Sequence, residues 1–218
     1  MNELQQKFNL YDHLGYILTG LYQIFVLWVF YVLLTGGNFV GISEFLKIEF
    51  SIALILSAYL VGHLVQAISN IFDSWERKKK EENDKDLNFV MDKAREFFSL
   101  PKELSGKKVW QYCYLYALSN DFSGHVALFN SMYSLYRGFW VASYVGGICS
   151  GVVLLVQCVN SVINKFSVYP DWKLFVFTCV TFGLGILFNR RKKRFFKYMG
   201  EKTLITFDIL SKDLIQKK

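Results

Sequence analysis

Apolar residues are gathered in four long stretches, and charged residues lie between and after them. No Asp, Glu, Lys or Arg occurs in residues 15–34, 50–72, 138–164 or 174–189. About 20 apolar residues in a helix are enough to cross the hydrocarbon core of a bilayer. The pattern therefore predicts four membrane-spanning helices. The fourth stretch is short, so we expect residues 170–173 and snorkelling basic side chains to complete that span.

The polar stretches also carry helical patterns. Leu87, Val90, Met91, Ala94 and Phe98 recur at helical spacing before Pro101, and the aromatic segment VWQYCYLYALS predicts a second short helix. Asp121 is among the N-cap candidates for a helix that runs into the third span. The fold class is therefore an all-α integral membrane protein with a small helical cytoplasmic portion. Its predicted parts are residues 1–72 with two spans, 73–138 as a cytoplasmic helical region, 139–189 with two spans, and 190–218 as a basic C-terminal helix.

Basic residues predict the orientation of the chain. Of the 25 Lys and Arg residues, 11 lie in residues 73–138 and 10 in residues 190–218. Basic segments are retained on the cytoplasmic side of a membrane. We therefore expect a multi-pass protein of the bacterial inner membrane with both termini in the cytoplasm.

A basic run follows the fourth span directly. Two interpretations stay open for it: contact with anionic lipid head groups, or contact with nucleic acid through clustered basic and aromatic side chains. The run consists of Arg190, Arg191, Lys192, Lys193 and Arg194.

Two spans contain polar residues at helical spacing. Such residues are costly against lipid, so each stripe is expected to face another helix or an aqueous cavity. Three interpretations remain open: hydrogen bonds between helices, a pore or ion path, and a proton relay through His63. The stripe of the second span is Tyr59, His63, Gln66, Asn70 and Asp73, and that of the first span includes Tyr16, Thr19 and Gln23.

The third span carries small residues that permit close approach of helices. Ser143, Gly147 and Gly151 are predicted to form a packing face, within the chain or between copies.

Sequence motifs for catalysis are missing. The three histidines are 50 or more residues apart, no cysteine lies within four residues of any of them, and no nucleotide-binding loop or nucleophile elbow occurs. We expect neither an enzyme nor a bound metal or cofactor.

Three stretches, YDHLGYILTG, AYLVGHLVQAIS and FNSMYSLYRGF, resemble small multi-spanning membrane proteins found beside bacterial anti-phage systems. These include membrane accessories of RNA-targeting CRISPR loci. Members of that group often have proline before the glycine of the first motif, where this chain has Thr19 before Gly20. The resemblance implies an oligomeric inner-membrane accessory or effector that acts when infection is sensed.

Three classes of function are therefore expected. The first is an antiviral defence protein that forms a channel or perturbs the bilayer, as a homo-oligomer. The second is a membrane scaffold or regulator that recruits a cytosolic defence protein. The third is a small transporter component, although the sequence contains no inverted repeat.

Overall fold

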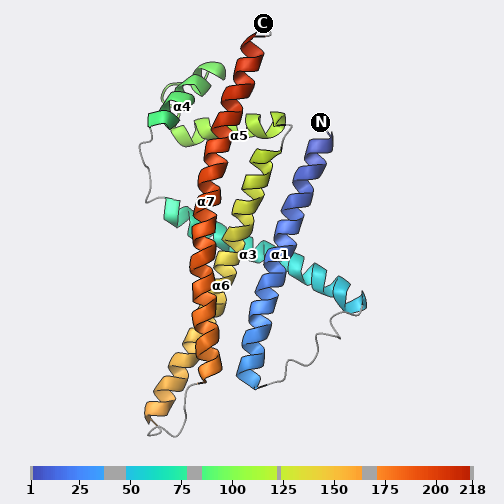
Figure 1. The fold of residues 1–218 in the computed structure, drawn as a ribbon, viewed down its shortest axis with the longest axis vertical. Coiled ribbons are helices and arrows are strands. Elements are labelled where there is room, and N and C mark those ends of the chain that lie inside the picture. The colour runs from blue at the N-terminus through green and yellow to red at the C-terminus, as the bar shows by residue number, and fades with distance from the viewer. Residues whose placement is uncertain (1, 37–47, 78–84, 122–123, 164–170, 217–218) are drawn as a thin grey trace. The chain divides into compact units, whose positions relative to one another are not determined.

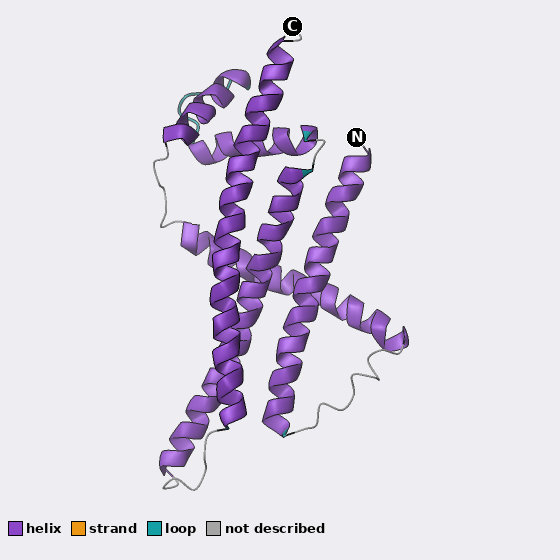
Figure 2. Cartoon of the chain, viewed as in Figure 1, coloured by secondary structure: helices purple, strands orange, loops and turns teal. Residues whose placement is uncertain are grey.

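The computed structural model describes residues 2–36, 48–77, 85–121, 124–163 and 171–216. Within these ranges the chain is all-helical, with six helices and no strands (Figures 1 and 2). The helices are α1 Asn2–Thr35, α3 Ile48–Arg77, α4 Lys85–Phe97, α5 Gly106–Asn120, α6 His125–Ile163 and α7 Trp172–Gln216.

Four of these helices are long and apolar enough to cross a membrane. The candidate spans are residues 13–35 of α1, 51–73 of α3, 125–163 of α6 and 172–212 of α7. This result agrees with the four helical spans expected from the uncharged stretches. The fourth apolar stretch, although short, belongs to a helix of 45 residues that continues through the basic run.

The chain divides into two compact units, each assembled from separated stretches. Unit 1 consists of residues 1–11, 74–133 and 193–218, and unit 2 of residues 12–73 and 134–192. Unit 2 contains most of the apolar helices, and unit 1 contains α4 and α5. The two longest helices, α6 and α7, contribute residues to both units.

In unit 2, α1 and α3 meet with their backbones in contact. A Cβ atom added to Gly20 would lie 1.7 Å from the carbonyl oxygen of Ala58, and one added to Gly62 would lie 1.9 Å from that of Tyr16. No side chain fits at either position. The two glycines therefore permit a close helix crossing of the kind that small residues allow in membranes.

The α6–α7 pair in unit 2 is held by hydroxyl groups and by aromatic rings seated on glycines. Thr178 Oγ1 lies 2.8 Å from Ser150 Oγ. The ring of Phe182 covers Gly147, at 3.1 Å from the position of an added Cβ, and the ring of Tyr144 covers Gly185 in the same way at 2.8 Å. None of these contacts between the two helices involves an ionised group.

Unit 1 has a core of its own, formed by α4, α5 and α7. The core contains Met91, Ala94, Val109, Cys113, Leu204 and Phe207. Phe97, Phe98 and Tyr116 pack their rings around Phe207 at centroid distances of 5.5–5.8 Å. The predictions of two short helices before and after Pro101 are confirmed.

Local signals explain where the helices of unit 1 begin and end. α4 ends where Ser99 adopts a left-handed conformation (φ 53°), and the amide of Leu100 donates to the carbonyl of Arg95. Such a bond satisfies an end carbonyl of the helix, and Pro101 follows. The N-cap position of α6 is Gly124, so the expectation of Asp121 as N-cap is wrong. Asp121 Oδ2 nevertheless accepts a hydrogen bond from the amide of Val126 at 2.9 Å, which satisfies a donor in the first turn of α6.

Candidate functional site

The candidate site is a buried polar network on one side of α3, in unit 2. Gln66, Ser69 and Asp73 are 4%, 0% and 4% exposed. His63 and Asn70, which belong to the same sequence stripe, are exposed. The stripe is therefore divided. The buried side of α3 also carries Ala58 and Gly62, about a third of a turn away from His63 and Asn70.

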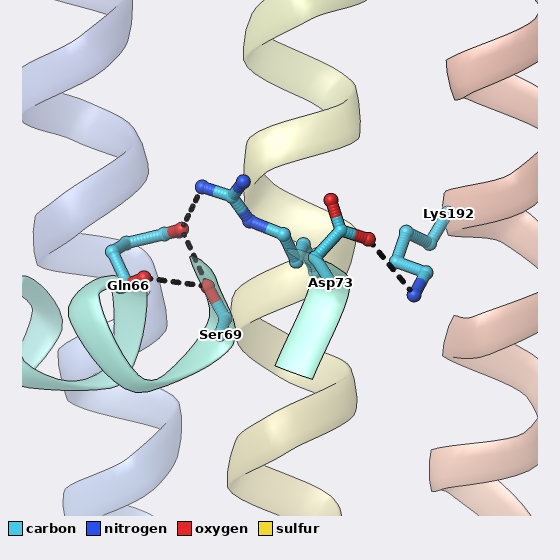
Figure 3. Close-up of polar contacts among 5 residues, drawn as sticks. Gln66, Ser69, Asp73 and Lys192 are labelled. Atoms are coloured by element: carbon cyan, nitrogen blue, oxygen red, sulfur yellow. Dashed lines mark hydrogen bonds and ion pairs between the residues drawn. The ribbon is translucent and has the colours of Figure 1, made fainter. Parts of the chain in front are cut away.

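Gln66 binds four groups from α3 and α6. Figure 3 shows its contact with Ser69. Its Nε2 atom donates to the carbonyl of Ser134 on α6 at 2.9 Å. Its Oε1 atom accepts from Arg137 Nη2 at 3.0 Å and from the hydroxyl of Ser134 at 3.3 Å. The Ser69 hydroxyl, also 3.3 Å from Oε1, lies 2.7 Å from the Gln66 carbonyl oxygen. Gln66 is thus a bonded amide that joins α3 to α6.

About two turns beyond Gln66 on α3, Asp73 binds Lys192 of α7 (Figure 3). The Nζ atom of Lys192 lies 3.4 Å from Oδ1 of Asp73, and the two side chains are only 2% and 5% exposed. The same Nζ lies 3.9 Å from the ring centroid of Trp140 on α6, a cation–π distance. A carboxylate, an indole ring and an ammonium from three helices therefore meet at one place.

The network lies at the limit of unit 2. Its described members include two cations, Arg137 and Lys192, and one anion, Asp73. Asp73, Ser134 and Lys192 are each the residue at which their helix enters or leaves unit 2. α3 is thus joined to the two longest helices, α6 and α7, and both of these contribute residues to each unit.

The polar residues of the first span lie in three different surroundings. Tyr16 stacks on the ring of His63 at a centroid distance of 3.9 Å, and Tyr59 lies edge-on to the same imidazole. Thr19 is buried, and its hydroxyl donates to the carbonyls of Gly15 and Tyr16. Gln23 is 5% exposed, and among the described residues its Nε2 has no hydrogen-bond acceptor. The structure brings Tyr16, Tyr59 and His63 together but leaves them apart from Asp73.

The basic run after the fourth span is also divided. Arg190, Arg191, Lys193 and Arg194 are exposed, as a surface contact with lipid or nucleic acid requires. Lys192 differs from that expectation because its side chain is turned toward Asp73 and Trp140. Arg194 Nε donates to the hydroxyl of Tyr198 at 2.8 Å.

The packing face expected on the third span is used within the chain. Ser143 is buried, and its hydroxyl lies 2.8 Å from that of Tyr22 on α1. Gly147 faces Phe182, and Gly151 lies opposite the methyl group of Thr178. Of the two open interpretations, the structure supports packing between helices of one chain.

Sequence reasoning missed Arg137 and Trp140, both of which complete the network. Arg137 immediately precedes the uncharged stretch, and a cation at that place is typical of a helix end at the membrane surface. A signal was present, however: the motif YRGF places a glycine next to the arginine. Gly138 lies against Thr19 and against the amide of Gln66, and its lack of a side chain permits that contact.

Among the described residues, no group of three or more His, Cys, Asp or Glu side chains is arranged to hold a metal ion. The chain matches no protein-family model, no curated protein and no solved structure. The class that the structure supports is an all-helical protein with four helices long and apolar enough to cross a membrane.

Proposed function

We propose that this chain is an inner-membrane accessory or effector of a bacterial anti-phage defence system, which acts as a homo-oligomer by forming a channel or perturbing the bilayer. The observation that carries the proposal is the buried Asp73–Lys192 pair. Ionised groups among membrane helices are expensive and usually functional. An apolar replacement of a buried ion pair is often as stable or more stable, so stability alone does not explain the pair.

The position of the pair supports a controlling role. It joins α3 to α7, and α7 continues into unit 1, whose core includes Phe207. We propose that unit 1 is cytoplasmic, in line with its many basic residues, and that its state is transmitted to the spans through this pair. The link to phage defence is supported by the resemblance of the three sequence stretches.

Oligomer formation is supported by polar side chains on the outside of α3. His63 and Asn70 are exposed on α3 and lie within its candidate membrane span, residues 51–73. Contact with a second copy removes an exposed amide from lipid at little cost. Mass photometry in nanodiscs tests this part. After the mass of the empty nanodisc is subtracted, particles should contain two or more chains of 25.4 kDa. A single chain per particle at all concentrations contradicts the proposal.

The proposed activity is tested with Asp73→Asn and with the double variant Asp73→Leu/Lys192→Met. At matched protein levels we expect both to lose phage protection in cells and ion flux in liposomes. Asp92→Asn is the control because Asp92 forms an exposed ion pair in unit 1. Full protection and flux in the double variant would refute the role of the pair.

The proposed topology is tested by cysteine accessibility in a chain without native cysteines. Lys102→Cys should be labelled from the cytoplasmic side and Thr35→Cys from the other side. Labelling of Thr35→Cys from the cytoplasm alone would refute the orientation.

A second candidate function, a membrane scaffold that recruits a cytosolic protein, is favoured by unit 1. That unit has its own aromatic core and an open groove beside it.

A further inference from the structure

A groove runs between α4 and α7 on the surface of unit 1. Its volume is about 520 Å³. Leu204, 6% exposed, is shared with the core of the unit, and Ile205 and Ile209 are 51% and 55% exposed. The lining residues are Val90, Lys93, Leu204, Ile205, Asp208, Ile209 and Lys212.

Three of the described residues that line the groove are charged. Asp208 binds Lys93 from α4 across the groove and Lys212 one turn further along α7 at 2.7 Å. These three residues have one positive charge in excess, and the side chain of Lys212 is 62% exposed. An additional carboxylate beside Lys212 balances this excess. The groove is therefore complementary to an acidic group that arrives together with apolar side chains.

We propose that this groove binds an acidic amphipathic helix of a cytosolic protein partner. Ile205 and Ile209, four residues apart, present an apolar ridge along α7, and α4 forms the second wall. A helix with apolar residues at matching spacing fits between two helices in this way. The proposal rests on the scaffold function described above, because it specifies what kind of protein segment the scaffold would recruit.

An anionic membrane surface is the competing occupant, and the shape of the site disfavours it. The groove is concave between two helices, whereas a membrane-bound helix inserts a convex apolar face.

The experiment measures binding of a synthetic peptide to the full chain in neutral nanodiscs. The probe is a helix of about 18 residues, or about 27 Å, with leucines at positions i, i+4 and i+7 and glutamates on its other faces. We expect micromolar binding that weakens about tenfold in Ile209→Glu and in Lys212→Glu. Leu115→Glu is the matched control because Leu115 is 61% exposed on α5, away from the groove.

Several results would overturn the proposal. One is absence of peptide binding to the unmodified chain. Another is equal binding of a peptide in which lysines replace the glutamates, or equal weakening by Leu115→Glu. A third is that phosphatidylglycerol in the nanodisc abolishes peptide binding, which assigns the groove to lipid. A fourth is that Ile209→Glu changes the particle mass without peptide, which assigns the groove to a second copy.

Folding and activity are controlled separately. Ile205→Gln, which adds no charge, should weaken peptide binding while the core thiol Cys113 stays protected from alkylation. If the unmodified chain binds the peptide but Ile209→Glu still protects cells from phage, the groove binds an acidic helix and its partner has no role in defence. Loss of flux in Asp73→Asn bears on the proposed function alone.

Discussion

Lys192 and Asp73 form an ion pair in which both side chains are almost completely buried, with 3.4 Å between Nζ and Oδ1. The two residues are 119 positions apart in the chain and come from different helices. Their charges fix where α3 lies against α7 at the limit of unit 2.

Removal of one partner of this pair should be strongly destabilising. Asp73→Ala leaves the ammonium of Lys192 buried without its carboxylate, and such losses cost about 3–5 kcal/mol. The double variant Asp73→Leu/Lys192→Met should instead be as stable as the unmodified chain or more so. Thermal unfolding in nanodiscs measures both. If Asp73→Ala unfolds at the temperature of the unmodified chain, the pair is not buried as described.

Gly20 should tolerate no side chain, whereas Gly15 on the same helix should tolerate one. Gly20→Ala places a methyl group against the backbone of Ala58, so the helices must separate, at about 1–3 kcal/mol or more. Gly15→Ala meets nothing within 4 Å and should stabilise α1 by up to about 1 kcal/mol. Resistance of each variant to unfolding by SDS gives the comparison. Equal resistance of the two variants is incompatible with the close crossing of α1 and α3.

Gln66→Leu should cost more than an average polar contact between membrane helices. Such contacts average about 0.6 kcal/mol, but Gln66 accepts from the charged guanidinium of Arg137, and such bonds contribute about 1.5–3 kcal/mol. Gln66→Glu retains an acceptor for Arg137 and should lose less. Asn70→Leu is the control because Asn70 is exposed on the same helix. Equal unfolding free energies for Gln66→Leu and Asn70→Leu would contradict this ranking.

Cys113 should be an unreactive thiol until unit 1 unfolds. Burial raises its pKa from the usual 9.0 to about 11, which lowers the thiolate fraction at neutral pH by roughly a hundredfold. We expect slow alkylation by N-ethylmaleimide in a variant that keeps only this cysteine, and rapid alkylation in SDS.

The same pKa shift predicts a pH dependence of stability. The pKa of Cys113 is higher in the folded state. Its ionisation should therefore leave the free energy of unfolding independent of pH below about pH 9.0 and should lower it as the pH rises toward about 11. A Cys113→Ala variant should lack this fall. Fast alkylation of the native chain at pH 7.5 would contradict both expectations.

Helices and spans were predictable from the sequence because they depend on local patterns. Uncharged stretches and helical spacing are read within a window of 20 residues, and they gave all four candidate spans as well as α4 and α5. The polar stripe of α3 was also recognised. Which part of it is buried was not, because the rotation of α3 about its axis depends on the contact between Gly62 and Tyr16.

The role of Lys192 was the least predictable part of the site. Five consecutive basic residues resemble a surface run, and a local pattern does not distinguish the one that turns inward. The distinction depends on Asp73 and Trp140, which lie 119 and 52 positions away along the chain. Arg137 escaped notice for the same reason, since its contact with Gln66 joins residues 71 positions apart.

The separation of these contacts along the chain bears on how the protein is made. The α6–α7 hairpin is joined by Ser150 and Thr178, only 28 positions apart, so it can form as soon as both helices have left the ribosome. Asp73 must wait for Lys192, which is synthesised 119 residues later. During that interval α3 lacks the contact that joins it to α7. A chain truncated before α7 would lack it permanently, so the final position of α3 depends on completion of synthesis.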